Sequence, residues 1–585
     1  MTAALGGGRM VWNAARQCAV LVAGCLLSLS LAVPAQPRQL LNYEAIHKPE
    51  TGASGMVVSQ NEAASRAGAQ VLREGGNAVD AAVATAFVLA VTLPRAGNIG
   101  GDGFMLLHLA DGDRYTAIDY RSAAPALATL DAYVGDDGQL DGHSAGIRAA
   151  GVPGTVAGLA LAHEKYGRLP WKRLLQPAIE MASQGIVLSV DEAFALDWGK
   201  ERLARSAAGA AVFLHPDGQA LAAGERLVQP DLAWTLRRIA DHGAEDFYRG
   251  EIARRLDAGM RGHGGLLRSE DLMAYRAIER VPLRSTYRNA EVVTMPPASG
   301  GGAGIVGTLN LLEQFDLAEL GAGSADALHL FAEASKLSWR DRLAHVGDTG
   351  FLDVPLRGLV AKEYAAGRAG RIRMDHATPA VDVEAGDPWA HEGPETTHFS
   401  VVDADGNVVS NTYTIGADFG SGVMIEGTGF LLGNLIGNFS LRAQLDAQRE
   451  GRPAPPNAME PGRRPVSSMA PTMLVRDGSP WLVTGSPGGN TIPGTVVQTI
   501  VNVVDFGMNV AEATMAPRVH QHMSGEGALQ VERGLSPDTL RLLEARGHIT
   551  STGQTIGSTQ MLLVEPGRVE GAADPRRPGA AAIAQ

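Results

Sequence analysis

The sequence predicts an α/β/β/α sandwich, in which two β-sheets pack face to face between two layers of helices. The first observation is a β-hairpin: Phe399 to Val402 and Val408 to Tyr413 flank the turn Asp405-Gly406, and Asp-Gly between apolar runs is a strong hairpin signal. The second is another hairpin around Asp477-Gly478. Helical patterns precede and follow both hairpins, so we expect helices to cover the outer faces of the sheets.

The first 35 residues have the features of an export signal. Arg9 and Arg16 precede the apolar run from Cys18 to Val33, and Val33-Pro34-Ala35 offers small residues to a signal peptidase. The apolar run is shorter than the roughly 18–20 residues of a membrane span. We therefore expect a cleaved signal over 1–35 and an exported protein, periplasmic or secreted. A lipoprotein attached through Cys25 is the alternative.

Composition excludes several classes of function. The net charge of −13 is not offset by any basic run, so a nucleic acid is not an expected partner. Both cysteines lie inside the signal, which leaves the mature chain without a disulfide, a thiol nucleophile or a thiolate metal site. The sequence also has no His-Glu-x-x-His motif and no Walker-type loop, so we expect no metal and no cofactor.

The segment after the signal predicts a strand and two helices. The strand begins near Gly55, the first helix stops at Gly75-Gly76, and Asn77 caps the second. The second helix is alanine-rich and apolar on all sides up to Leu93, which predicts a buried helix. A glycine-rich turn, "AGNIGGDGFM", then leads into a strand of another hairpin.

The middle of the chain is less clearly patterned. From Gly151 to about Val360 the pattern is mainly helical, interrupted by the glycine-rich stretch from Met295 to Gly304. Leu441 to Arg464 is polar and proline-rich, which predicts either a loop over a site or a long surface connection. After the second hairpin, "TIPGTVVQTIVNVVDFG" predicts a helix.

Two threonines stand out in the first hairpin. Thr396 lies nine residues before Asp405 and Thr414 nine residues after it, so a tight turn places them opposite each other or one residue apart. If the chain were cut before Thr396, this residue would carry a hydroxyl and a free α-amine, which together make a nucleophile and its base. A threonine-rich β-ladder without chemistry is the alternative.

Three further features could serve a reaction. The turn Gly485-Ser486-Pro487-Gly488-Gly489 could offer backbone N–H groups to an oxyanion, or could simply need glycine for positive φ. Arg121 could pair with a substrate carboxylate, or could be an ordinary surface arginine. Ser467-Ser468 could donate two hydroxyls, or could begin a strand.

In this combination and order, these segments resemble the γ-glutamyltranspeptidase family of N-terminal-nucleophile hydrolases. The resemblance covers nearly the whole mature chain. It includes the motifs "GGNAVDAAVA", "AGNIGGDGFM", "AIDYR", "GVPGTVAGL", "TTHFSVVDADGNVV", "RRPVSSMAPT", "GSPGG" and the terminal "DPRR".

The resemblance implies a precursor that cuts itself between Glu395 and Thr396. The products would be a large subunit, 36–395, and a small subunit, 396–585, which together form one four-layer catalytic unit. Thr396 would be the nucleophile, and its freed α-amine, with a typical pKa of about 7.7–8.0, the general base. Thr414 would steady the Thr396 hydroxyl.

The resemblance also assigns the remaining site residues. Gly488 and Gly489 match the oxyanion hole, and Arg121, Ser467 and Ser468 match the groups that hold the substrate's α-carboxylate. The amino-group pocket departs from the pattern of glutathione-handling members. Three positions there differ: Gly416, Leu435 and Asn438. Elsewhere in the chain, Asp102 and Ser122 replace a glycine and a glutamate that are common in those members.

The function implied is hydrolysis of γ-glutamyl amides or transfer of their γ-glutamyl group, with water, an amino acid or a peptide as acceptor. Glutathione is the family's usual substrate. An amidase or acylase of the same family, acting on glutaryl-like or other carboxylated acyl groups without an α-amine, is the second hypothesis. An inactive binding protein is the third, against which the retained Thr396, Thr414, Gly488 and Gly489 argue.

Overall fold

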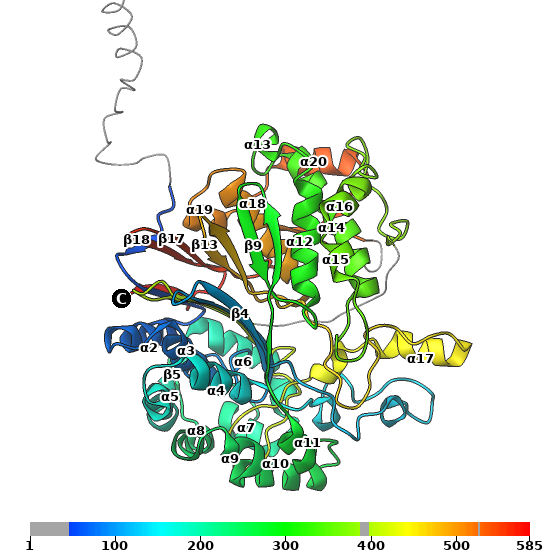
Figure 1. Cartoon of the computed structure of the whole chain (residues 1–585). Coiled ribbons are helices and arrows are strands. Elements are labelled where there is room, and N and C mark those ends of the chain that lie inside the picture. Colours follow the sequence, from blue (N-terminus) through cyan, green and yellow to red (C-terminus); the bar gives the residue numbers. More distant parts are fainter. Residues whose placement is uncertain (1–45, 387–396, 524–526) are drawn as a thin grey trace, which may run out of the picture. The chain divides into compact units, whose positions relative to one another are not determined.

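The computed structural model describes residues 46–386, 397–523 and 527–585, and residues His47–Gln585 form one compact unit. The predicted signal over 1–35 and both residues of the predicted cut, Glu395 and Thr396, lie outside the described residues. Two seven-stranded sheets pack against each other inside this unit, with helices on both outer faces (Figure 1). The predicted α/β/β/α sandwich is therefore confirmed.

The first sheet carries the hairpin of the candidate site near its centre. Its strand order is β19-β2-β10-β11-β3-β4-β7, and every neighbouring pair is antiparallel. The strands are β2 (Met56–Ser59), β3 (Asp102–Leu109), β4 (Arg114–Asp119), β7 (Ile278–Arg280), β10 (Thr397–Val402), β11 (Val408–Thr414) and β19 (Ala581–Ala584).

The second sheet has the order β1-β18-β17-β13-β12-β9-β8 and is also antiparallel throughout. Its strands are β1 (Glu50–Gly52), β8 (Leu283–Tyr287), β9 (Ala290–Thr294), β12 (Thr472–Arg476), β13 (Ser479–Thr484), β17 (Gln560–Glu565) and β18 (Arg568–Ala573). Two small sheets lie outside the sandwich: β5 (Ile186–Val187) with β6 (Arg226–Leu227), and β14 (Val519–Gln521) with β15 (Leu529–Val531) and β16 (Thr550–Thr552).

Helices from the first half of the chain lie on the side of the first sheet, and helices from the second half lie on the side of the second (Figure 1). The first group is α2 (Glu62–Arg73), α3 (Ala78–Thr92), α4 (Thr155–Tyr166), α5 (Trp171–Gln184), α6 (Val190–Leu203), α7 (Ala207–Phe213), α8 (Pro230–His242), α9 (Glu245–Arg249), α10 (Glu251–Gly262) and α11 (Ser269–Ala274). The second is α12 (Gly300–Leu312), α13 (Leu317–Leu320), α14 (Ala325–His345), α15 (Leu356–Leu359), α16 (Lys362–Ala369), α18 (Ile492–Val504), α19 (Val510–Met515) and α20 (Pro537–Ala545). α17 (Leu441–Glu450) packs on a separate small core.

Successive side chains along the strands of the first sheet contribute in turn to the cores on its two faces. Val57 and Val401 join the core beneath α3, whereas their neighbours Met56 and Val402 join the core that contains the second sheet. Successive side chains of a strand point to opposite faces, so a strand between the two cores is buried on both sides, and a polar side chain in it needs a hydrogen-bond partner. β10 is buried at every position.

Local capping explains the well-predicted elements. Asn77 accepts backbone N–H groups of α3 and its own N–H reaches Asp80, a capping box, and every residue of this helix is buried as predicted. At the turn of the first hairpin, the Asp403 carboxylate accepts the N–H groups of Asp405 and Asn407 at 3.0 and 2.9 Å. Gly406 there has φ of +85°, which a glycine adopts without strain.

The structure corrects three expectations. The segment between Gly151 and Val360 contains the strands β7, β8 and β9, which were missed because charged residues break their apolar alternation. The predicted interruption from Met295 to Gly304 is shorter than expected, because α12 already begins at Gly300. Leu441–Glu450 is a helix and not a loop; its apolar side packs on the small core beneath it.

None of the helices in the described parts of the chain is both long enough and apolar enough to cross a membrane.

Candidate active site

The register of the first hairpin is the one that its turn predicts. The last described pair on this side of the ladder is Thr397 with Tyr413, and Thr414 pairs on its other side with Asp102 of β3. The predicted pairing of Thr414 with Thr396 involves a residue outside the described ranges, so it stays a prediction. Among the described residues, the ladder partner of Thr414 is Asp102, the first residue of β3.

The Thr414 side chain is buried, and its hydroxyl is hydrogen-bonded to the backbone just after the end of β11. Its hydroxyl oxygen accepts the backbone N–H of Gly416 at 2.8 Å. The chain packs closely here: a Cβ on Gly101 would lie 2.0 Å from the Thr414 carbonyl oxygen, so only glycine fits. A hydroxyl whose position is fixed in this way is suited to orient a neighbouring group by a hydrogen bond.

The glycine-rich turn lies between β13 and α18, as predicted. Gly488 has φ of +125° and Gly489 of +56°, so both adopt conformations that favour glycine. The Gly488 carbonyl accepts both the N–H and the hydroxyl of Thr491, at 3.0 and 2.9 Å. The turn is confirmed; the assignment of its N–H groups to an oxyanion stays a prediction.

His398 connects the glycine turn to the start of β10. A Cβ on Gly485 would lie 2.4 Å from the His398 ring, and the two ring nitrogens lie 2.9 and 3.0 Å from the hydroxyl oxygens of Thr412 and Ser400. Burial lowers the pKa of His398 to about 3, so the ring is uncharged at neutral pH. Sequence reasoning missed this residue, although a histidine among β-formers was the visible signal.

Arg121 is not a surface arginine. Its side chain is 1% exposed, and its Nη1 donates to both carboxylate oxygens of Asp102, at 2.8 and 2.9 Å. Nε donates to the Pro465 carbonyl at 3.0 Å, and Nη2 to the Val466 carbonyl at 3.3 Å. Asp102 thus connects Arg121 to Thr414, which is the ladder partner of Asp102. The two carbonyl groups connect Arg121 to the segment just before Ser467.

Ser467 and Ser468 are buried, and their segment packs against the start of α12. The Ser467 hydroxyl oxygen accepts the N–H of Met469 at 3.1 Å, and the Ser468 hydroxyl oxygen accepts from Nη2 of Arg342 at 3.0 Å. A Cβ on Gly301 would lie 2.0 Å from the Ser468 carbonyl oxygen. The glycines of this helix thus allow it to approach the two serines closely.

The segment that departs from the family pattern has no carboxylate at its three altered positions. Asn438 is half-buried and neutral, and the Leu435 side chain is apolar and buried. A Cβ on Gly416 would lie 1.9 Å from Oδ1 of Asn434, which accepts the N–H of Ala417 at 2.8 Å. Asn434 therefore fills the space beside Gly416.

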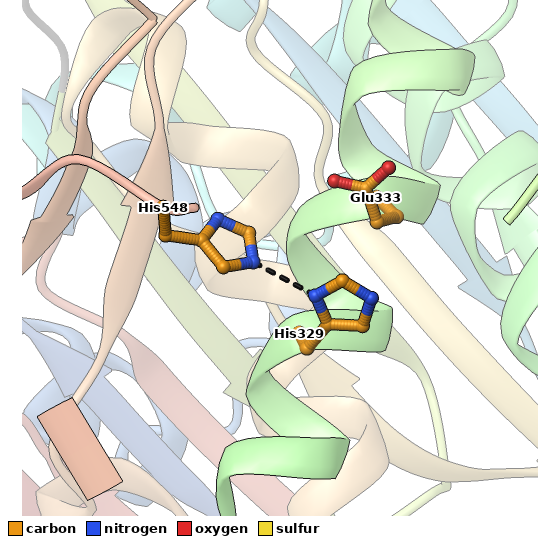
Figure 2. A group of neighbouring side chains, drawn as sticks. All are labelled: His329, Glu333 and His548. Atoms are coloured by element: carbon orange, nitrogen blue, oxygen red, sulfur yellow. Dashed lines mark hydrogen bonds between the residues drawn. The ribbon is translucent and has the colours of Figure 1, made fainter. Parts of the chain in front are cut away.

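A second cluster of ionisable side chains lies in the other helical layer. Figure 2 shows His329 and Glu333 on one face of α14, with His548 opposite them; their possible ligand atoms lie within 4.8 Å of one another. Nε2 of His329 lies 2.7 Å from the Arg373 carbonyl, so its Nδ1 accepts from Nε2 of His548 at 2.8 Å. Two histidines with a carboxylate form a donor set that could hold a divalent metal.

The same contacts give this cluster a structural role. Glu333 accepts from the Lys336 ammonium at 2.6 Å and from the N–H of Thr378. A metal would have to replace the proton between the histidines and compete with a buried ammonium. We interpret the cluster as a hydrogen-bonded link between α14 and the chain before β16. The spacing of His329 and Glu333, four residues apart, was visible in the sequence and was not singled out.

Comparisons with known proteins agree with this arrangement. The family described as gamma-glutamyltranspeptidase matches residues 64–584. A glutathione hydrolase proenzyme of Escherichia coli (strain K12) is 44% identical over 564 residues, which cover 95% of this chain and 96% of that protein. An acylase ACY 1 proenzyme of Pseudomonas sp. (strain V22) is 38% identical, with 92% and 95% covered.

Among solved structures, the cephalosporin acylase of Bacillus halodurans has a TM-score of 0.83 at 30% identity, over 94% of this chain and 99% of that one. The similarity thus extends over almost the full length of relatives that are named as hydrolases of glutathione and as acylases. This chain is an enzyme of the γ-glutamyltranspeptidase family, and it has the fold of the N-terminal-nucleophile hydrolases.

Proposed function

We propose that the chain is the precursor of a γ-glutamyl hydrolase and transferase that activates itself by cutting between Glu395 and Thr396. The observation that carries the proposal is the hairpin register, because a β10 strand continued by one residue would bring position 396 opposite Thr414. The full-length similarity to a glutathione hydrolase proenzyme supports it. The proposed products are the large subunit, 36–395, and the small subunit, 396–585.

The proposed self-cleavage is an intramolecular acyl transfer. The Thr396 hydroxyl attacks the Glu395 carbonyl, the peptide C–N bond breaks, and the acyl group moves from nitrogen to oxygen as an ester. Water then hydrolyses the ester, which leaves a carboxylate on Glu395 and a free α-amine on Thr396. The same residue thereby acquires the base that its hydroxyl needs for later turnover.

Turnover would follow the same chemistry on an external amide. The Thr396 amine takes the hydroxyl proton as the oxygen attacks the substrate carbonyl, and it delivers the proton to the leaving amine. The N–H groups of Gly488 and Gly489 would stabilise the oxyanion. Water, an amino acid or a peptide then accepts the acyl group from the Thr396 ester. Ser467, Ser468 and Asn438 would line the acyl pocket together with Arg121.

Mass spectrometry of the purified wild-type protein tests the proposal. We expect two subunits, with the small one beginning at Thr396, and a large one that begins near residue 36 because the signal over 1–35 is removed during export. A pure protein that remains a single chain after prolonged incubation would contradict the self-cleavage. A cut at another peptide bond would remove Thr396 from the role of nucleophile.

The acylase hypothesis is the second candidate, and the altered amino-group pocket favours it. An α-ammonium group buried without a carboxylate partner costs several kcal/mol. Neither Asn438 nor Leu435 provides a negative charge. Glu426, a carboxylate nearby in sequence, is 65% exposed and lies 3.6 Å from His263. An acyl group without an α-amine avoids this cost.

Paired substrates that differ only in the α-amine distinguish the two candidates. We expect the wild-type enzyme to cleave γ-glutamyl and glutaryl p-nitroanilides with kcat/KM values within about tenfold, which is about 1.4 kcal/mol. Asn438→Asp should shift the ratio toward the γ-glutamyl substrate, with the glutaryl rate of the same variant as internal control. A strong wild-type preference for γ-glutamyl that the variant leaves unchanged would show that another acid binds the amine.

A further inference from the structure

The guanidinium group of Arg121 is surrounded by hydrogen-bond acceptors of the protein itself. All three of its nitrogens make hydrogen bonds: to the Asp102 carboxylate, to the Pro465 carbonyl and to the Val466 carbonyl. The side chains of Arg121 and Asp102 are 1% and 0% exposed. The positive charge is therefore paired inside the fold, on the side of the site where a substrate carboxylate would need it.

Asp102 is fixed by contacts of its own besides the ion pair with Arg121. It is the first residue of β3 and pairs in the ladder with Thr414. Its Oδ2 also accepts the N–H of Ser122 at 2.8 Å. Burial raises the pKa of the Asp102 carboxyl, and the Arg121 guanidinium and the Ser122 N–H offset part of this rise. The pair is thus part of the strand framework and not a mobile surface contact.

A carboxylate on the substrate would meet an unfavourable site here. To bind Arg121, the substrate carboxylate could displace Asp102, which would leave the Asp102 carboxylate buried without its partner. If it did not displace Asp102, it would approach a neutral ion pair and be repelled by the negative charge of Asp102. An uncharged group has neither problem. The Ser467 hydroxyl, whose oxygen already accepts from Met469, keeps its own proton to donate to a neutral carbonyl oxygen.

We propose that Asp102 broadens the acyl specificity of this enzyme by neutralising Arg121, so that the pocket accepts acyl chains with an uncharged end as well as those with a carboxylate. The additional substrate class is then amides of neutral acyl groups, such as the glutaramoyl group, which ends in a carboxamide. This inference rests on the proposed function, because it concerns the pocket that delivers the acyl group to Thr396.

The wild-type enzyme with a matched pair of substrates gives the first test. Glutaryl p-nitroanilide carries a terminal carboxylate, and glutaramoyl p-nitroanilide replaces it by a carboxamide of the same shape. We expect kcat/KM for the glutaramoyl substrate to equal or exceed that for the glutaryl substrate. A preference for the glutaryl substrate of more than tenfold would overturn the inference, because Arg121 would then bind a carboxylate in spite of Asp102.

Variants of Asp102 give the second test. Asp102→Asn keeps the shape and Asp102→Gly removes the side chain; both release the Arg121 charge. Each should move the kcat/KM ratio at least tenfold toward the glutaryl substrate, mainly through a lower KM. Asp574→Asn is the matched control, because Asp574 is an equally buried acid that is paired with a different buried arginine, Arg518. It should leave the ratio unchanged.

Whether the protein splits into two subunits shows which of the two proposals has failed, this inference or the proposed function. If the wild-type protein does not split at Thr396, the proposed function fails. If it splits and the Asp102 variants that also split keep the wild-type ratio, only the specificity role of Asp102 fails. If neither Asp102 variant splits, the ratio of the two wild-type rates decides the inference alone.

Discussion

Replacing Thr396 by alanine is expected to leave the protein as one chain and to abolish turnover. The variant lacks the hydroxyl that both the self-cleavage and the later acyl transfer require. In other hydrolases, loss of the nucleophile lowers kcat by roughly 10⁶-fold. Intact-mass analysis should show no subunit that begins at residue 396, and p-nitroanilide hydrolysis should fall to background.

Thr397→Ala is the matched control, because the neighbouring threonine has a structural contact. The Thr397 hydroxyl donates to Oε1 of Gln60 at 2.7 Å inside the fold, and loss of a hydrogen bond of this kind costs about 1 kcal/mol of stability. This variant should still split and turn over substrate. If Thr396→Ala protein still divides at Glu395–Thr396, another protease makes the cut, and the self-cleavage mechanism is wrong.

Gly488→Val is expected to lower kcat by about 10²–10³-fold, the effect that loss of one oxyanion donor has in other hydrolases, about 2.7–4 kcal/mol. Valine is strained at φ of +125°, and its Cβ would lie 2.3 Å from the Thr491 hydroxyl oxygen. The turn must therefore move, and its N–H groups move with it. Steady-state kinetics on the processed enzyme measure the loss in kcat separately from KM.

Gly478→Val provides the matched control for backbone strain. Gly478 also has a positive φ, +82°, but it lies in the turn at the other end of β13 and nothing surrounds its missing Cβ within 4 Å. This variant should lose stability and keep kcat. Wild-type turnover in a processed Gly488→Val enzyme would place the oxyanion hole elsewhere in the site.

Elements with a complete local signal could be predicted from the sequence. The Asp-Gly hairpins, the Asn77 cap and the glycine turn after β13 depend on residues within a few positions of one another. The strands β7, β8 and β9 are short and each contains one or two charged residues, and α17 is mostly polar. Contacts with distant parts of the chain stabilise these elements, so their local pattern does not identify them.

The candidate site divides in the same way. The sequence by itself determined the family, the hairpin that carries Thr414, and which positions in the amino-group pocket lack a carboxylate. Only the tertiary structure decided that Asp102, at the start of β3, pairs with Arg121, beyond the end of β4. The same holds for His398, which packs beneath Gly485, 87 residues further along the chain. A residue's charge is local information, but whether that charge is free for a substrate depends on which partners the packed strands bring to it.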